Sequence, residues 1–325
     1  MTKIGFIGLG IMGEGMVNCL LKDAVAGTPE TPLLIWNRTS SKCDNLKASH
    51  PDKTIDIQPS AKDVVSNCDI VFSMLSTPEA SAAVFNDGTT GTLAGVSNTS
   101  VIIDCATLAE SDMKRMSDQV TAKGGKFLEA PVSGSKGPAH GGQLIFLCAG
   151  SKDVFDDTVV QAALNAMGKA SHYFGEEVGK ATRAKLVVNS LMGTMMAAFG
   201  ESMALAESLD LDGSKMLEVI SQGAIATPMF ALKGPKMLKK DHAPNFPLCH
   251  AHKDMKLAVD AAKSVGVEYS VTQVAEETFR KAREDDELKV ANEDFSAVFS
   301  KRFTRIRKVI IQRRESWVET FSYCH

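Results

Sequence analysis

A glycine-rich turn close to the N-terminus constrains the fold of this chain more than any other feature. The residues Gly8-Leu9-Gly10-Ile11-Met12-Gly13 follow a short apolar run, Ile4 to Ile7, and precede a helix-forming segment, Glu14 to Lys22. The order strand, glycine-rich turn and helix directs backbone N–H groups and a helix N-terminus toward a pyrophosphate. The first glycine permits the tight turn, the second lets phosphates approach the backbone, and the third lets the helix pack on the strand. These six residues are therefore predicted to bind a dinucleotide.

The segment after the second predicted strand, 33–36, indicates which dinucleotide binds. It reads Asn37-Arg38-Thr39-Ser40-Ser41-Lys42, without the carboxylate that an NAD site usually carries for the ribose 2′-hydroxyl. A guanidinium, hydroxyls and an ammonium suit a doubly charged 2′-phosphate, because a guanidinium can donate paired N–H bonds to phosphate oxygens. We therefore expect NADP(H) rather than NAD(H), with contacts from Asn37, Arg38 and Thr39.

The first half of the chain alternates apolar strand-like runs with helical stretches. The predicted strands after the second are 69–75, 101–104, 126–130, 144–149 and 171–174, and the predicted helices are 60–67, 77–85, 111–122 and 151–167. Nearly continuous apolar strands that alternate with helices are typical of a doubly wound parallel sheet. We therefore predict an α/β fold with a Rossmann domain over residues 1–178.

Beyond residue 179 we find only helical periodicity. Residues 182–209 are predicted to form one long interdomain helix, apolar on most sides and therefore expected to be buried all round. We expect an all-α domain for substrate and oligomerisation over 179–299. Residues 300–325 form a basic C-terminal extension, with seven Lys or Arg residues against two Glu.

Composition excludes several classes of protein. A chain of 325 residues can form two domains, and its net charge of −3 argues against a nucleic-acid surface over the body. No apolar run is long enough to cross a bilayer. The seven scattered cysteines resemble reduced small hydrophobes, and Cys249-His250-Ala251-His252 lacks further ligands, so no metal is expected. With a first strand beginning at residue 3, no targeting peptide is expected, and we predict a cytoplasmic protein.

Three further segments carry groups that suit catalysis. Glu129 to Pro138 is a strand end that opens into a Ser/Gly loop, whose N–H groups and hydroxyl suit a carboxylate. Lys185 and Asn189 are four residues apart and share one face of the long helix. The third segment, His250 to Met255, lies in the helical domain. The plainer interpretation of the second segment is a snorkelling lysine beside a hydrogen-bonded asparagine. The plainer interpretation of the third is a solvated helix start.

Together these segments resemble the β-hydroxyacid dehydrogenase family, which includes 3-hydroxyisobutyrate dehydrogenases, and within it the glyoxylate/succinic semialdehyde reductase branch. The resemblance spans residues 3 to about 298. It rests on several ordered motifs: the glycine-rich turn, Trp36-Asn37-Arg38-Thr39, Glu129-Ala130-Pro131-Val132-Ser133-Gly134-Ser135, Lys185-Leu186-Val187-Val188-Asn189, Pro228-Met229-Phe230, Phe246-Pro247-Leu248, Lys253-Asp254-Met255 and Asp294-Phe295-Ser296-Ala297-Val298.

The resemblance implies the roles of residues on the substrate side. Lys185 would be the catalytic residue, and Asn189 would support the substrate. The loop Ser133, Gly134 and Ser135 would hold the substrate carboxylate. Phe246 and Asp254 match positions that line the substrate side.

The resemblance also implies further contacts with the cofactor. Thr107 would lie by the nicotinamide, as would the loop that contains Met74, Leu75 and Pro78. Lys253 matches a family lysine that reaches the cofactor.

We therefore expect NADPH-dependent reduction of short oxo acids, glyoxylate to glycolate and succinic semialdehyde to 4-hydroxybutyrate, with Lys185 as the general acid. An NAD-linked dehydrogenase of the 3-hydroxyisobutyrate type is the alternative, and Asn37-Arg38-Thr39 argues against it. A non-catalytic dinucleotide-binding module, as in chromatin proteins of this family that have lost the lysine, is disfavoured because Lys185 is present. A homodimer or homotetramer is expected by analogy, without a membrane partner and with a nucleic-acid partner disfavoured.

Overall fold

The computed structural model of the chain describes residues 1–299, so the predicted basic extension, 300–325, lies outside the described residues. The chain divides into two compact units, the first covering Met1–Val188 and the second beginning at Asn189. The predicted domain limits, 1–178 and 179–299, stay a prediction. Among the described helices, none combines the length and the hydropathy of a membrane span.

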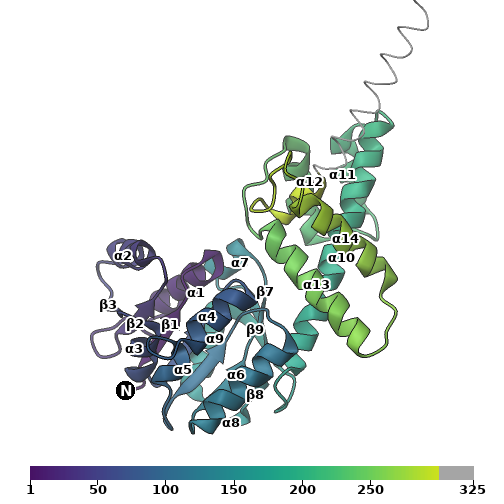
Figure 1. The fold of residues 1–325 in the computed structure, drawn as a ribbon. Helices are drawn as coiled ribbons and strands as arrows, with labels where there is room; N and C mark the ends of the chain where they lie inside the picture. The colour runs from purple at the N-terminus through teal and green to yellow at the C-terminus, as the bar shows by residue number, and fades with distance from the viewer. Residues whose placement is uncertain (300–325) are drawn as a thin grey trace, which may run out of the picture. The chain divides into compact units, whose positions relative to one another are not determined.

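A nine-stranded sheet organises the described part of the first unit (Figure 1). The strands are β1 (Ile4–Ile7), β2 (Leu33–Trp36), β3 (Ile55–Ile57), β4 (Ile70–Ser73), β5 (Val101–Asp104), β6 (Lys126–Glu129), β7 (Val132–Ser133), β8 (Leu144–Gly150) and β9 (Gly168–Tyr173). Six parallel strands follow the order β3-β2-β1-β4-β5-β6, and β8 adds antiparallel to β6. This order, with its reversal beside β1, is that of a dinucleotide-binding doubly wound sheet. The predicted Rossmann fold is confirmed.

Helices cover both faces of this sheet. They are α1 (Ile11–Lys22), α2 (Ser40–Ser49), α3 (Ala61–Ser66), α4 (Pro78–Asn86), α5 (Thr92–Gly95), α6 (Glu110–Ala122), α7 (Lys136–His140), α8 (Lys152–Phe155) and α9 (Thr158–Met167). One buried cluster joins strand residues such as Phe6 to Leu20 of α1 and Leu164 of α9. A second joins Ile7 to Val64 of α3 and to α6. Adjacent residues of β1 thus enter opposite cores, as the two-residue period of a strand requires.

The sequence pattern missed short elements and one break. The strands β3 and β7 have three and two residues, too few to show a pattern. The helix predicted over 151–167 is interrupted, because Asp157 accepts hydrogen bonds from the N–H groups of Val159 and Val160 and begins a new helix there.

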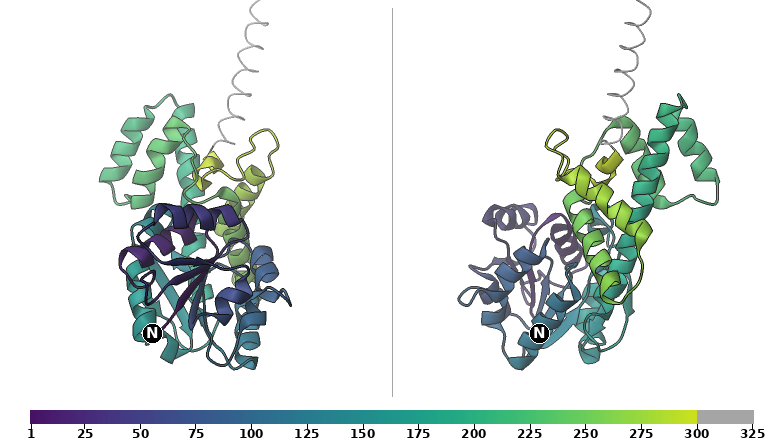
Figure 2. Two further views of the ribbon diagram at one scale, coloured as in Figure 1. Left: turned by 90° about the vertical axis from the view of Figure 1, so that its left-hand side faces the viewer. Right: turned by 45° about the vertical axis from the view of Figure 1, so that its right-hand side comes forward.

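The described part of the second unit is helical. It contains α11 (Gly213–Gln222), α12 (Pro228–Lys239), α13 (Leu248–Ser264), α14 (Ser270–Arg283) and the 3-10 helix η1 (Phe295–Phe299). The helices α13 and α14 lie side by side (Figure 2). Among the described residues of this unit, the only strand-type pairing is an isolated β-bridge between Pro247 and Asp294. The prediction that the C-terminal domain is all-α is confirmed for the described residues.

The long helix α10 (Lys180–Ser208) begins in the first unit and continues into the second. Its length agrees with the prediction for 182–209, but the expectation that it is buried all round is wrong. Met196 and Met203 are buried in the core of the second unit, whereas Val187, Leu191 and Leu205 are each about 60% exposed. The apolar residues of this helix therefore divide between a packed face and an exposed one.

Candidate active site

The predicted cofactor residues of the first unit gather at one edge of its sheet. Gly8 follows β1, Asn37 follows β2, Met74 follows β4, and Thr107 lies three residues beyond β5. Because β1, β2, β4 and β5 are parallel neighbours, these positions share the carboxyl edge of the sheet. In open α/β sheets ligands bind at this edge, where the strand order reverses.

The glycine-rich turn has the local geometry that its sequence predicts. Gly8 has a φ of +100°, and a Cβ there would lie 2.5 Å from the carbonyl oxygen of Met74. A Cβ at Gly13 would lie 1.9 Å from the carbonyl oxygen of Gly8, so helix and turn approach too closely for a side chain. A Cβ at Gly10 would meet nothing within 4 Å. No side chain caps α1 at Gly10, so the first N–H groups of α1, including those of Ile11 and Met12, are suited to binding an anion.

Asn37 fastens this turn to the end of β2. Its Oδ1 accepts a hydrogen bond from the N–H of Leu9 at 2.9 Å, and its Nδ2 donates to the carbonyl oxygen of Thr39 at 2.9 Å. The N–H of Gly8 donates to the carbonyl oxygen of Trp36. The N–H of Leu9 is thus already bound within the protein, and its side chain is buried in the core. Asn37 therefore shapes the turn, a contribution that the sequence pattern did not predict.

A cavity of about 360 Å³ opens between the turn and α4. Seven of the predicted cofactor residues line it: Gly8, Gly10, Asn37, Arg38, Thr39, Met74 and Leu75. Leu9, Ile11, Met12, Gly13, Pro78 and Thr107 do not line it. Pro78 instead occupies the start of α4, where Thr77 caps the helix by accepting a hydrogen bond from the N–H of Ala80.

Several residues that line the cavity were not among the predicted site residues. The apolar wall comes from Ala80, Ala83 and Val84, whose i, i+3, i+4 spacing on α4 was a readable signal. Lys42, whose ammonium already supported a 2′-phosphate in the sequence, adds a second cation to the lining. Asp87 brings a carboxylate, whose Oδ1 already accepts hydrogen bonds from the N–H groups of Thr89 and Thr90. These bonds lower the pKa of Asp87, the bond from Thr90 most.

Two buried carboxylates continue the row of strand ends. Asp104 ends β5 and Glu129 ends β6, in register with each other. Burial raises the pKa of Asp104 to about 6, although the N–H of Ala106 donates to its Oδ1 at 3.0 Å. Its other oxygen, Oδ2, is buried without a hydrogen-bond partner among the described residues. Burial also raises the pKa of Glu129, against four donors that favour the charged form.

The predicted carboxylate-binding loop and the predicted catalytic lysine both lie in the first unit. Ser133 belongs to β7 and pairs with Ile145 of β8. Gly134 has a φ of +138°, and a Cβ there would lie 2.7 Å from Leu144, so a larger residue would distort the loop. Ser135 precedes α7. Lys185 lies in the second turn of α10.

The structure brings together three predicted residues of the second unit. Asn189 on α10 donates a hydrogen bond from Nδ2 to Oδ2 of Asp254 on α13, at 2.6 Å. The Nζ of Lys253 lies 2.8 Å from the other oxygen of Asp254. Asp254 therefore contacts both an ammonium and an amide.

Phe246, the remaining predicted residue, is held by a buried ion pair that the sequence did not predict. Both oxygens of Asp294 lie within 2.7 Å of Nζ of Lys233, and Oδ2 also accepts from the N–H of Phe246 at 3.2 Å. The ring of Phe246 packs edge-on against Phe295, with centroids 5.6 Å apart. Lysine and aspartate 61 residues apart give no local signal that they pair.

In the segment 249–252, the side chain of His252 has protein partners. Nε2 of His252 lies 2.8 Å from a carboxylate oxygen of Glu276, and its Nδ1 lies 3.1 Å from the guanidinium of Arg283. Within residues 1–299 no group of three His, Cys, Asp or Glu is placed to hold a metal ion.

Comparison with known proteins identifies the family. The NAD binding domain of 6-phosphogluconate dehydrogenase matches residues 3–175, and the domain described as NAD-binding of NADP-dependent 3-hydroxyisobutyrate dehydrogenase matches 179–300. Glyoxylate/succinic semialdehyde reductases 2 (chloroplastic) and 1 of Arabidopsis thaliana are 42% and 40% identical over 297 residues, 91% of this chain and 78% and 96% of those proteins. The chain belongs to the β-hydroxyacid dehydrogenase family.

The structure of a β-hydroxyacid dehydrogenase relative agrees with this assignment at the level of fold. A 3-hydroxyisobutyrate dehydrogenase from Salmonella typhimurium superposes with a TM-score of 0.80 at 22% identity, covering 92% of this chain and 99% of that one. As a β-hydroxyacid dehydrogenase, this chain is an oxidoreductase that uses a nicotinamide dinucleotide. The open approach to Gly10 and the cations beside the cavity fit such a cofactor.

Proposed function

We propose that the chain is an NADPH-dependent reductase of short oxo acids, acting on glyoxylate and succinic semialdehyde to yield glycolate and 4-hydroxybutyrate. The cofactor assignment rests on two cations, Arg38 and Lys42, which line the same cavity as the glycine-rich turn. A 2′-phosphate would meet a guanidinium and an ammonium there. Among the described residues, the one carboxylate that lines this cavity is that of Asp87, and one of its oxygens is bound by neighbouring N–H groups. Identity of about 40% to two reductases of these substrates supports the substrate assignment.

In this proposal the reaction divides between cofactor and protein. When bound, NADPH supplies the hydride that reduces the aldehyde carbon. Ser133 and the N–H groups of its loop hold the substrate carboxylate, and Asn189, Phe246 and Asp254 line the substrate. Lys253 keeps its predicted role at the cofactor.

Lys185 supplies the acid chemistry. Negative charge grows on the aldehyde oxygen as the carbon is reduced, and an ammonium stabilises that charge before its proton moves to the oxygen. The hydroxy acid then carries both new hydrogens, and the neutral amine regains a proton from water.

A panel of small oxo acids tests the proposal, with loss of nicotinamide absorbance as the readout. We expect turnover of glyoxylate and succinic semialdehyde with NADPH, and much weaker turnover with NADH. Efficient oxidation of 3-hydroxyisobutyrate with NAD, without reduction of either aldehyde, would instead establish the NAD-linked dehydrogenase. A homodimer or homotetramer and a cytoplasmic location stay predictions, which sedimentation and localisation experiments would test.

A further inference from the structure

A buried carboxylate joins β6 to the start of α10. Oε1 of Glu129 accepts hydrogen bonds from the N–H groups of Gly179, at 2.6 Å, and Ala181, at 2.9 Å. Its Oε2 accepts from the N–H of Thr182 at 3.3 Å and from the Thr182 hydroxyl at 2.6 Å. Glu129 is fully buried, and Thr182 is only 1% exposed. Four donors around one carboxylate define the position of the first turn of α10.

Physical chemistry explains why a carboxylate lies there. The first N–H groups of a helix have no partner within the helix, and the helix dipole places partial positive charge at this end. A carboxylate satisfies both conditions, and hydrogen bonds to an ionised acceptor are stronger than those between neutral groups. Here the acceptor comes from a strand about 50 residues earlier in the chain, so it links sheet and helix rather than capping locally.

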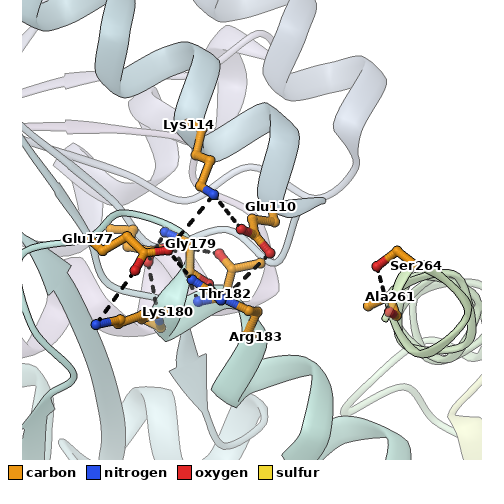
Figure 3. Close-up of polar contacts among 11 residues, drawn as sticks. Glu110, Lys114, Glu177, Gly179, Lys180, Thr182, Arg183, Ala261 and Ser264 are labelled. Carbon is orange, nitrogen blue, oxygen red and sulfur yellow. Dashed lines mark hydrogen bonds and ion pairs between the residues drawn. The ribbon is translucent and has the colours of Figure 1, made fainter. Parts of the chain in front are cut away.

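The other charges at this helix end are exposed or, in the case of Glu110, partly exposed. Glu177 and Glu110 pair with Arg183, and Lys114 and Lys180 complete the cluster around Gly179 and Thr182 (Figure 3). Surface pairs of this kind contribute little to stability, because water screens them. They surround the start of α10 without entering the buried contact that Glu129 makes.

The position of Glu129 in the chain relates this contact to catalysis. The residues that follow it, 130–132, lead directly to Ser133, and Thr182 lies three residues before Lys185. Positions three apart lie on the same side of a helix. One carboxylate is thus tied both to the strand that leads to the carboxylate-binding loop and to the turn that precedes the lysine.

We propose that Glu129 is a positioning residue for the reductase, which sets Lys185 relative to Ser133 by holding the first turn of α10. This inference rests on the proposed function, because it assigns Lys185 the acid role. Small displacements of a reacting group are costly, since a misplacement of about 1 Å can reduce a rate on the order of 10²-fold.

Three variants test the contact at graded severity. Glu129→Gln keeps the shape of the side chain but presents an amide N–H₂ to donors. Thr182→Val removes one hydroxyl, and Thr182→Ser restores it. We expect kcat to fall about 10- to 100-fold in Glu129→Gln and several-fold in Thr182→Val, with near wild-type kcat in Thr182→Ser. The matched control is Glu177→Gln, which removes an exposed carboxylate from the same helix end and should leave kcat unchanged.

The readouts separate positioning from general stability. All proteins are assayed well below their unfolding midpoints, and NADPH affinity is measured by energy transfer from tryptophan, because Trp36 lines the cavity. A loss of kcat with unchanged NADPH affinity, restored by Thr182→Ser, supports positioning. Normal kcat in both Glu129→Gln and Thr182→Val overturns it, as does a loss shared equally by Glu177→Gln. A wild-type protein that reduces no oxo acid overturns the proposed function itself, and the assignment of Glu129 falls with it.

Discussion

Replacing Lys233 with methionine should lower the free energy of unfolding far more than the small change in side-chain size suggests. The substitution preserves most of the aliphatic stem but removes the ammonium that lies 2.6 and 2.7 Å from the two oxygens of Asp294. Asp294 is fully buried, and Lys233 is only 3% exposed. Breaking a buried pair by removing one partner typically costs about 3–5 kcal/mol, because an uncompensated charge remains.

The surroundings of Asp294 place the expected cost at the lower end of that range. After the substitution its carboxylate still accepts hydrogen bonds from the N–H groups of Asn245, Phe246 and Ser296. Three remaining donors partly compensate the charge, so we expect a loss of about 3 kcal/mol. The double variant Lys233→Met/Asp294→Asn should recover about 1–2 kcal/mol of this, because an amide oxygen in the place of Oδ2 can still accept the bonds from Asn245 and Phe246 without carrying a charge.

Urea unfolding followed by circular dichroism measures these differences. The matched control is Lys236→Met on the same helix, whose ammonium lies 3.6 Å from the half-exposed Asp241 and whose loss should cost under about 1 kcal/mol. A Lys233→Met cost equal to that of the control, or a double variant no more stable than the single one, would refute the reasoning.

The pH dependence of this pair has a defined sign. Burial alone would raise the pKa of Asp294, but Lys233 and the neighbouring N–H and hydroxyl donors together hold it below its ordinary value. A depressed pKa contributes stability above the pKa of the unfolded chain, and that contribution is lost as the pH falls through the folded value. The stability difference between wild type and Lys233→Met should therefore shrink below about pH 4.

Three further predictions concern the first unit. Arg38→Ala should raise the KM for NADPH about 10- to 100-fold, the equivalent of about 1.5–3 kcal/mol for a charged hydrogen bond, and should leave the KM for NADH unchanged. The control is Lys47→Ala at an exposed position of α2, and equal effects of Arg38→Ala on both cofactors would contradict a 2′-phosphate contact. Gly10→Ala should fold normally but bind NADPH weakly, whereas Gly13→Ala, whose Cβ would lie 1.9 Å from a carbonyl oxygen, should lower the unfolding midpoint; equal midpoints would refute the packing role. Burial raises the folded pKa of Asp104 to about 6, so the stability that this group contributes is lost as the pH rises from about 4 to about 6. Asp104→Asn should therefore gain about 2–3 kcal/mol on wild type between pH 4 and pH 7, measured by urea titration, and a constant difference would contradict this.

The parallel sheet and the glycine-rich turn could be predicted because their signals are local. The runs at β1, β4 and β5 are nearly continuously apolar, as is typical of strands buried on both faces, and few residues other than glycine adopt a φ of +100°. The strand β7 has only two residues, and the break at Asp157 depends on one side chain, so the sequence pattern predicts neither of them.

The contacts that arrange the site could not be predicted from the sequence. Asn37 lines the cavity, but nothing local in the sequence shows that it also binds the N–H of Leu9, 28 residues away. The partners of Glu129 and Asp294 lie about 50 and 60 residues from them in the chain. Such pairs depend on the tertiary fold, and a single sequence shows only that each residue is present. The exposed apolar face of α10 is missed for the same reason, because hydropathy cannot say which apolar residues find a neighbour.

The central claim is tested most directly by single-turnover reduction of glyoxylate by the NADPH complex of Lys185→Met, compared with wild type. Removing the ammonium should slow the chemical step on the order of 10²-fold or more, while tryptophan energy transfer shows unchanged NADPH binding. A variant that reduces glyoxylate at the wild-type rate would contradict the assignment of Lys185 as the acid.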